Sequence, residues 1–459
     1  MTIDPSIFKY YDIRGTYPDK INEDISREIA KAIHKFFSEK LDKNDFTIVL
    51  SRDMRVSSPT IFEAVKEVLL RRGANVIDLG ISSTPTFYFA VSYYKYDAGI
   101  QITASHNPKE YNGIKFVMNT PQGLLKIGKP TGMDDIRDLA VNGVPDIEIK
   151  EGTFTKKDGV LEDEVKNAMN IFKNPQIKKF KIVADAANAV GALYIDALSK
   201  ILPIELVRMN FELDGTFPVH QADPMQPENL VDIQKRVVEE GADLGLAPDG
   251  DGDRLFIINE KGEVVPPPQI IGMLSKELLE EFPGSKVVVD QKYFLTAKKI
   301  VEEHGGELVL SKTGHAYITE TMTKTGAIFA GEASAHYYYK ATGNAESQVM
   351  TIVGVLKVLT EENKPISEIA EEFRRSYESG EFNYEVSNAK EVMNYLKNKY
   401  NDAELSEMDG IAINYPDWRF SARSSNTEPL LRVNVEGATR ELVDRETAKL
   451  KEEIESIAK

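Results

Sequence analysis

Short β-branched apolar runs alternate with longer runs of helical periodicity along most of the chain. The first example begins near residue 46, where FTIVLSRD and NVIDLG flank SPTIFEAVKEVLLRRG, and it ends at AGIQITASHNP. Short β-branched runs are typical of strands, whereas apolar positions spaced three to four apart are typical of helices. The pattern therefore predicts strand, helix, strand, helix, strand.

The same order occurs twice more. Near residue 180 the strand-like runs are FKIVADAAN, IELVRMN and ADLGLAPDGDGDR, and near residue 286 they are KVVVDQK, ELVLSKT and AIFAGEASAH. In all three copies the third run leads directly into a polar cluster. Such alternation predicts βαβ units with mainly parallel sheets, whose ligand loops follow the carboxyl ends of the strands. We therefore expect three related α/β domains with mainly parallel, mixed sheets.

The pattern changes after a helical run at 347–362. Beyond EENKPISE the chain reads as a helix, then FNYEVSN, a second helix, GIAINYPDWRFSARSSNTEP, LLRVNVEGA and a charged terminal helix. This order predicts an α+β domain. At 459 residues the chain exceeds the size of a single core. The expected division is 1–150, 151–256, 257–364 and 365–459.

Composition narrows the function classes. The net charge of -17 disfavours nucleic acid or an anionic membrane as a partner, so an anionic ligand needs a locally basic site. The absence of cysteine excludes disulfides, thiolate zinc sites and cysteine nucleophiles. The beginning, MTIDPSIFKYYDIRG, does not resemble a signal peptide, and no apolar run is long enough to span a bilayer, so a cytoplasmic location is expected.

Three aspartates separated by glycines follow the third strand of the second copy. Asp249, Asp251 and Asp253 lie in DGDGDR between two apolar runs. Carboxylates this close repel one another unless a cation lies among them, and hard cations such as Mg²⁺ prefer oxygen ligands. An EF-hand is the rival interpretation because Glu260 completes its spacing, but Arg254 stands where that loop needs glycine and the flanks read as strands. A metal site is predicted, with Arg254 able to reach a phosphate.

The polar loop RSSNTEP follows an alternating strand. It places Arg423 beside Ser425, Asn426 and Thr427. A forked cation next to hydroxyl and amide donors suits a phosphate, but the same residues suit an ordinary hairpin. On its own this loop leaves both interpretations open.

GEASAH ends the third copy. If the stretch stays extended, Glu332, Ser334 and His336 lie on one face. That face suits sugar hydroxyls or a phosphate, and it equally suits the polar side of an ordinary strand. Both interpretations are open here as well.

ITASHNP ends the first copy and contains Ser105. Ser, Asn and Pro are common turn formers, so the stretch predicts a turn, while a serine at a strand end can also be a nucleophile or a phosphate carrier. Of the histidines, His34 and His304 lie in helical runs and are interpreted as structural, and His220 fits either role. Basic side chains at strand ends are candidates for binding an anion: Arg14, Arg52, Arg55, Lys115, Lys292, Lys312 and His315.

The motifs YDIRG, TASHNP, DGDGDR, GExSxH and RxSNTEP occur in this order, accompanied by SRDMRVSS, YNGIKF, ADPMQPENL and KTGH. This ordered set resembles that of the α-D-phosphohexomutase superfamily, most closely its phosphomannomutase/phosphoglucomutase branch, from about Tyr11 to the C-terminus. The resemblance implies four domains, three of them related α/β units around a central cleft. It also implies an enzyme that interconverts hexose 1-phosphate and hexose 6-phosphate of mannose, glucose or both.

The resemblance further implies a role for each motif. Ser105 would carry a phosphoryl group, donate it to a hexose phosphate, and regain one from the hexose 1,6-bisphosphate intermediate. One Mg²⁺ per chain would be held by Ser105, Asp249, Asp251 and Asp253. General acid/base work would fall to Lys115, with its pKa depressed by neighbouring cations. Further groups would act at the reacting centre: Arg14, His336 and Arg254.

Substrate binding is implied for a larger set. Glu332 and Ser334 would bind sugar hydroxyls. The other substrate contacts would come from Lys292, Lys312, His315, Arg423, Ser425, Asn426 and Thr427. The partners are thus small hexose phosphates, and the protein is expected to be a monomer or a homodimer.

Two departures from the family pattern concern the sugar loop. Ala335 stands where glycine is usual, and ATGNAESQVM lacks the expected Asp-Gly pair. Substrate choice among mannose, glucose and glucosamine phosphates therefore stays open, with a phosphoglucosamine mutase as the alternative. A phosphoserine-dependent sugar phosphatase and a non-catalytic sugar-phosphate binder are further alternatives.

Overall fold

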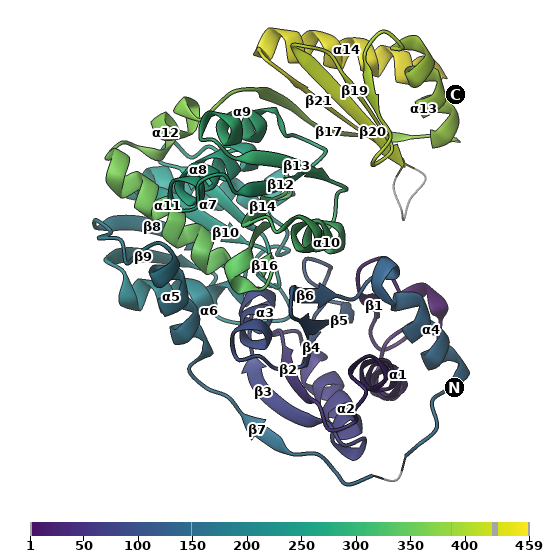
Figure 1. The fold of residues 1–459 in the computed structure, drawn as a ribbon. Coiled ribbons are helices and arrows are strands. Elements are labelled where there is room, and N and C mark those ends of the chain that lie inside the picture. Colours follow the sequence, from purple (N-terminus) through teal and green to yellow (C-terminus); the bar gives the residue numbers. More distant parts are fainter. Residues whose placement is uncertain (1, 148, 387, 425–429, 458–459) are drawn as a thin grey trace.

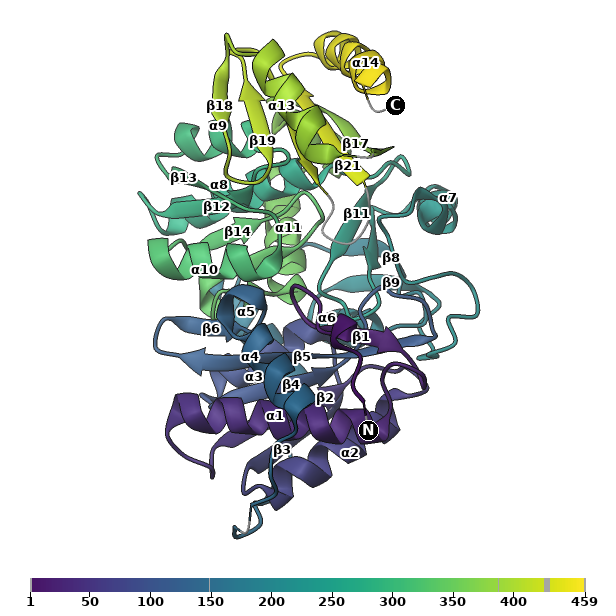
Figure 2. The same ribbon diagram turned by 90° about the vertical axis from the view of Figure 1, so that its right-hand side faces the viewer.

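The computed structural model describes residues 2–147, 149–386, 388–424 and 430–457. Within these ranges the chain forms four sheets, one after another along the sequence. Figure 1 shows the first unit at the lower end and the C-terminal unit at the top, and Figure 2 shows the same order from the side. Three α/β units followed by an α+β unit confirm the predicted fold class.

The first unit has a sheet of order β1-β5-β4-β2-β3-β7, with β6 paired to β5. Strands β1, β4, β2, β3 and β7 run in one direction, and β5, which lies between β1 and β4, runs antiparallel to both of its neighbours. The strands are β1 Ile13–Thr16, β2 Thr47–Arg52, β3 Asn75–Ile81, β4 Ala98–Ile102, β5 Tyr111–Thr120, β6 Gly123–Lys126 and β7 Phe154–Lys156. The helices are α1 Glu23–Leu41, α2 Ser58–Arg71, α3 Thr84–Tyr93 and α4 Met133–Asn142.

The second and third units have sheets of order β11-β10-β8-β9 and β13-β12-β14-β15-β16. Their strands are β8 Phe180–Asp185, β9 Ile204–Met209, β10 Leu244–Pro248, β11 Leu255–Asn259, β12 Lys286–Asp290, β13 Glu307–Ser311, β14 Phe329–Gly331, β15 Tyr337–Tyr339 and β16 Ala345–Glu346. Their helices are α5 Val160–Ile171, α6 Gly191–Ile201, α7 Val231–Glu240, α8 Pro267–Glu281, α9 Leu295–Glu303, α10 His315–Thr325, α11 Gln348–Glu362 and α12 Ile366–Glu372.

One arrangement recurs in all three units. The third strand of each repeat, β4, β10 or β14, lies beside the first strand of that repeat and is followed by an antiparallel neighbour, β5, β11 or β15. The chain therefore leaves the carboxyl end of a parallel strand, makes a loop, and returns along the edge of the same strand. The loops at these three reversals are the polar clusters that the sequence places after the third strands.

The apolar runs of the second and third units pack into one core. A single cluster of buried side chains reaches from Val165 on α5 to Phe373 after α12 and includes Ile257 and Val289. A second cluster fills the first unit. Strand β7 pairs with β3 although it follows residue 150, so the division of the chain at that residue stays a prediction.

The C-terminal unit has an antiparallel sheet of order β17-β21-β20-β19-β18, and α13 and α14 lie on one face of it (Figure 1). Its elements are β17 Tyr377–Glu385, α13 Ala389–Lys399, β18 Glu404–Ser406, β19 Ile411–Asn414, β20 Trp418–Ser424, β21 Leu430–Gly437 and α14 Arg440–Ile457. The buried guanidinium of Arg419 donates to the carbonyls of Gln291 and Lys292, and Glu436 accepts from the backbone of Phe294. These bonds attach the sheet to the loop between β12 and α9.

The described residues also form short 3₁₀ helices at Pro5–Ile7, Lys129–Thr131, Pro227–Leu230 and Lys340–Thr342. None of the helices within the described ranges combines the length and apolar character needed to cross a bilayer.

Candidate active site

Ser105 lies three residues beyond the end of β4, in a buried turn with a left-handed φ of 51°. Its backbone N–H donates to Thr103 Oγ1 at 3.0 Å. Its Oγ lies 3.1 Å from Asp249 Oδ2 and 3.1 Å from His106 Nδ1. The serine loop of the first unit and the aspartate loop of the second unit therefore meet at this hydroxyl.

The three aspartates of DGDGDR form a buried cluster between β10 and β11. Oxygen atoms of Asp249, Asp251 and Asp253 all lie within 4.8 Å of one another. Burial, and then the other two carboxylates, raise the pKa of Asp249 well above its ordinary value. Among the described residues, Asp251 Oδ1 has no hydrogen-bond partner, and Asp253 Oδ1 lies 3.3 Å from His336 Nε2. Buried oxygens with free acceptor capacity fit a hard cation such as Mg²⁺, and the flanking strands exclude an EF-hand.

Lys115, on β5, lies among these carboxylates. Its Nζ donates to Asp251 Oδ2 at 2.6 Å and to Asp253 Oδ2 at 2.7 Å. Burial lowers the pKa of Lys115, but the two carboxylates outweigh burial and raise that pKa well above its ordinary value. The expectation of a depressed pKa is therefore wrong for this arrangement, because the nearest charges are anionic.

Two arginines contact the loops that meet at Ser105. Arg14 donates through Nε to Asp12 at 2.8 Å and through Nη1 to the side-chain oxygen of Asn107. Arg254 donates through its backbone N–H to Asp249 Oδ1 at 3.2 Å, and its Nη1 lies 3.7 Å from Asp223 Oδ1. Arg14 thus binds the serine loop, and the backbone of Arg254 binds the aspartate loop.

GEASAH is a turn rather than an extended stretch. The N–H of Glu332 donates to the carbonyl of His336 and the N–H of Ala335 donates to that of Glu332, both at 3.0 Å, which reverses the chain between β14 and β15. The alternation predicted for an extended strand does not apply. The polar set still converges, since Ser334 Oγ lies 2.9 Å and a Glu332 oxygen 3.5 Å from His336 Nδ1.

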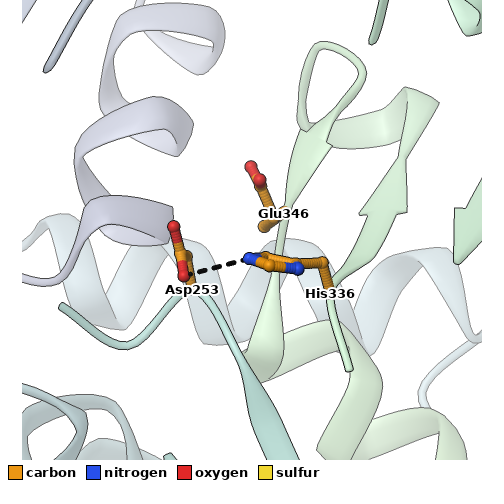
Figure 3. Close-up of side chains that lie close together, drawn as sticks. All are labelled: Asp253, His336 and Glu346. Atoms are coloured by element: carbon orange, nitrogen blue, oxygen red, sulfur yellow. Dashed lines mark ion pairs between the residues drawn. The ribbon is translucent and has the colours of Figure 1, made fainter. Parts of the chain in front are cut away.

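His336 connects this turn to the aspartate loop. Its Nε2 lies 3.3 Å from Asp253 Oδ1, and Figure 3 marks this pair with a dashed line and shows Glu346 of β16 above the ring, with its carboxylate pointing away from it. Glu346 pairs with Lys126 of β6, a bond between the first and third units. Lys115 and Lys126 already neutralise Asp253 and Glu346, so this second acidic group is satisfied by protein cations.

The remaining predicted substrate residues are spread over the third and fourth units. Lys292 Nζ lies 2.9 Å, and Arg423 Nη2 3.7 Å, from the same oxygen of Glu381. Lys312 lies 5.5 Å from the ring centroid of Tyr317. Burial, and then Lys126 and Lys115, lower the pKa of His315 well below its ordinary value, which favours the neutral imidazole. Ser425, Asn426 and Thr427 lie outside the described residues.

Two of the other histidines, His34 and His220, have structural partners. Burial and then Arg72 lower the pKa of His34 to about 4, and Arg72 donates to this ring. His220 lies 3.1 Å from Asp185 Oδ2, and this bond raises the pKa of His220. His304 follows α9 at its C-terminal end.

Sequence reasoning missed several side chains that hold the site. Thr84 Oγ1 donates to Asp251 Oδ2 at 2.6 Å, and Gln348 Nε2 donates to the carbonyl of Asp253 at 2.6 Å. Thr84 lies in the run SSTPT at 82–86, where Ser83 caps α3 by accepting from the N–H of Thr86. The run therefore resembles an ordinary helix N-terminus and gives no signal of a site. Glu381 follows a β-bulge in β17. The sequence signal for this bulge is Gly380, a glycine with positive φ within a strand-like run.

Comparison with known proteins decides the family. Models described as phosphoglucomutase/phosphomannomutase α/β/α domains I, II and III match residues 5–128, 162–262 and 266–377, and the model of the C-terminal domain matches residues 381–453. The chain belongs to the phosphoglucomutase/phosphomannomutase family.

Full-length relatives of this phosphohexomutase support the same conclusion. A protein named phosphohexose mutases from Xanthomonas campestris pv. campestris is 37% identical over 94% of both chains. A phosphomannomutase from Vibrio cholerae is 36% identical over 94% of both chains. A solved phosphoglucomutase/phosphomannomutase family protein from Burkholderia thailandensis is 29% identical with a TM-score of 0.86, covering 99% of this chain and 98% of that one. The predicted family is confirmed, and the protein is a hexose phosphate mutase.

Proposed function

We propose that the protein interconverts the 1- and 6-phosphates of mannose, glucose or both through a phosphoserine at Ser105 and a hexose 1,6-bisphosphate intermediate. The observation that carries this proposal is the 3.1 Å contact between Ser105 Oγ and Asp249 Oδ2 in a buried cluster of three carboxylates. Relatives named phosphomannomutase and phosphohexose mutases support the substrate class.

Each half-reaction exchanges one phosphoryl group for one proton. A sugar hydroxyl attacks the phosphorus of phosphoserine, the bond from phosphorus to Ser105 Oγ breaks, and the hydroxyl proton ends on Oγ. In the second half, Ser105 Oγ attacks the other phosphate of the bisphosphate, and its proton passes to the sugar oxygen that leaves. Phosphoryl transfer depends more on positioning and charge neutralisation than on a strong nucleophile, so a serine without a catalytic triad suffices.

We assign the proton transfers to Lys115, with Arg14 and His336 beside it and Arg254 at the transferring phosphate. Lys115 is buried and lies within 2.7 Å of two aspartates, so its ammonium is a charged proton donor next to the site of the transferring phosphate. His106, 3.1 Å from Ser105 Oγ, is the second candidate.

One Mg²⁺ per chain would be held by Asp249, Asp251, Asp253 and Ser105. When bound, the ion would neutralise charge on the transferring phosphoryl oxygens. The oxygen-only donor set supports this assignment, as does the buried Oδ1 of Asp251, which has no hydrogen-bond partner among the described residues.

Substrate binding completes the proposal. We assign the sugar hydroxyls to Glu332 and Ser334. The phosphate that does not react and the rest of the substrate are assigned to Lys292, Lys312, His315, Arg423, Ser425, Asn426 and Thr427. A single phosphate site explains how a bisphosphate can react in both orientations, because the site can bind either end. The expected four domains, a monomer or homodimer, and a cytoplasmic location belong to this proposal.

The test compares wild type with Ser105→Ala in coupled assays on mannose, glucose and glucosamine 1-phosphates, primed by the 1,6-bisphosphate. We expect Ser105→Ala to lose about 10³-fold or more in kcat, because the group that carries the phosphate is gone. Ser275→Ala removes another buried serine, on α8, and serves as the matched control. Full activity of Ser105→Ala would sink the phosphoserine mechanism.

The same assays separate the alternatives. Turnover of glucosamine 1-phosphate alone would favour a phosphoglucosamine mutase. Steady release of inorganic phosphate without isomerisation would favour a phosphatase, and binding without turnover would favour a non-catalytic binder.

A further inference from the structure

The guanidinium of Arg55 binds the backbone of the loop that carries Ser105. Its Nη2 donates to the carbonyls of Ser105 and Asn107, both at 2.6 Å. Its Nη1 donates to the carbonyls of Pro108 at 2.7 Å and Tyr111 at 3.1 Å. The side chain is 0% exposed. Three carbonyls of the serine loop and that of Tyr111, the first residue of β5, therefore converge on a single buried cation.

Arg55 is itself held from two units. Asp53 Oδ2 lies 3.2 Å from its Nε, and Asp53 Oδ1 accepts from the backbone of Arg55 at 2.9 Å and from Ser58 Oγ, at the start of α2, at 2.6 Å. The ring centroid of Phe217, between β9 and β10 of the second unit, lies 5.1 Å from the guanidinium carbon. The position of this guanidinium is thus set before any ligand binds.

The serine loop needs such support because its conformation is strained. Ser105 has φ 51°, a left-handed value that is strained for a residue other than glycine and persists only when its surroundings enforce it. The aspartate loop packs directly against the Ser105 carbonyl, since a Cβ built on Gly250 would collide with that carbonyl oxygen. The carbonyl that Arg55 binds is therefore also the one against which the metal loop packs.

We propose that Arg55 is the positioning residue of the phosphate-carrying loop. Its planar fork holds the Ser105 carbonyl and three neighbouring carbonyls, and this keeps Oγ facing Asp249 without contact between Arg55 and the sugar. A lysine ammonium has three donors at one point and cannot span four carbonyls. The inference rests on the proposed function, because it presumes that Ser105 carries the phosphoryl group.

The test follows phosphoryl uptake from glucose 1,6-bisphosphate by intact mass, together with kcat and KM. We expect Arg55→Lys to slow uptake and kcat by about 10²-fold, because misplacement of a reacting group by roughly 1 Å costs that much. The KM for hexose phosphate should stay within about threefold, since Arg55 does not bind substrate. Added methylguanidine should partly restore uptake by Arg55→Ala.

Arg72→Lys is the matched control. Arg72 is also buried in the first unit and donates to a backbone carbonyl, that of Pro145 at 2.9 Å, but it lies at the end of α2 away from Ser105. This variant should lose thermal stability and keep the wild-type kcat. If Arg55→Ala does not fold, Arg55→Lys, which keeps the charge, decides the question alone.

The outcomes separate the two proposals. Wild-type uptake by Arg55→Lys, or a raised KM at unchanged kcat, would overturn the role of Arg55 while leaving the phosphoserine mechanism intact. If wild-type protein itself takes up no phosphoryl group, the proposed function and the inference fail together.

Discussion

Around Ser105 the side chains are bound to one another and to the backbone, whereas around Lys292 and Arg423 the cations lie against one carboxylate. At the Ser105 end, for example, one oxygen of Asp251 accepts hydrogen bonds from both Thr84 and Lys115, each at 2.6 Å. At the second end, Glu381 lies 2.9 Å from Lys292 and 3.7 Å from Arg423. Charge is balanced at both ends, and within the described residues the groups at the first end also bind one another and the backbone.

The difference matches what each end has to do in the proposed reaction. The reacting end must place atoms to within a fraction of an ångström, so its groups are buried and held by several partners. The phosphate-binding end must accept and release either phosphate of a bisphosphate. When no phosphate is bound, a carboxylate that pairs with the cations keeps them in place. It also makes phosphate release less costly in free energy, because the cations are never left unpaired.

Asp251→Asn should give the largest effect, because it breaks the bonds at the Ser105 end. We expect kcat to fall by about 10³-fold while KM stays within about threefold. The change removes charge at the transferring phosphate and not at the residues proposed to bind the other phosphate. Steady-state kinetics at saturating Mg²⁺ measures both parameters. Asp135→Asn, on the exposed face of α4, is the control. Near-normal kcat in Asp251→Asn would mean that the cluster is not at the reacting centre.

Glu164→Gln tests how the units around the reacting end are joined. Glu164 of α5 accepts from Thr86 of the first unit at 2.8 Å and from Ser347 of the third at 3.4 Å, and burial raises its pKa to about 7. A carboxyl with a raised folded-state pKa binds a proton that the unfolded chain releases, so stability falls as the pH rises from about 4.5 to about 7.

Glu164→Gln should remove this dependence of folding stability on pH, because glutamine does not titrate. Relative to wild type, Glu164→Gln should gain about 1–3 kcal/mol at pH 8 and little at pH 5, since one pKa unit corresponds to about 1.4 kcal/mol. Melting temperatures by calorimetry between pH 5 and pH 8 follow the difference. Glu162→Gln, exposed on the same helix, should keep the wild-type slope. A constant difference across this range would refute the buried titration.

Glu381→Gln tests the exchangeable end. Burial raises the pKa of Glu381, but Lys292 and then Arg423 outweigh it, so the carboxylate is charged at neutral pH and competes with phosphate. Its removal should lower the KM for hexose phosphate, and the inhibition constant of inorganic phosphate, by about threefold. Arg423→Gln should act in the opposite direction and raise KM about tenfold. A raised KM in Glu381→Gln would show that Glu381 orients the cations instead of competing for them.

Ala335→Gly should give the smallest effect. Ala335 is buried with φ 65°, so glycine relieves about 1 kcal/mol of left-handed strain and gives up about 0.8 kcal/mol of methyl burial. The melting temperature should therefore stay within a few degrees of wild type. Ala333→Gly, in the same turn but without positive φ, has no strain to relieve and should lose stability. Equal losses in both variants would show that Ala335 is not strained.

Local features of the site were predictable from the sequence. The three repeats, the loops after β4, β10 and β14, and the clustering of Asp249, Asp251 and Asp253 all follow from spacing along the chain. GEASAH was not predictable as a turn, because the bonds between Glu332 and His336 that close it leave no composition signal. Arg55 was visible only as one basic residue among many, because its four acceptors are backbone carbonyls with no sequence signature.

The sequence by itself determined the order of strands and helices, the loops at strand ends and the chemical types that those loops carry, since all of these depend on neighbours along the chain. The tertiary structure decided which charge faces which. It placed Lys115 between Asp251 and Asp253, which reverses the expected direction of the lysine's pKa, and it brought Glu381 to Lys292 and Arg423. Pairing and pKa depend on burial and on distances of a few ångströms between residues far apart in the chain, and only the packed units set these.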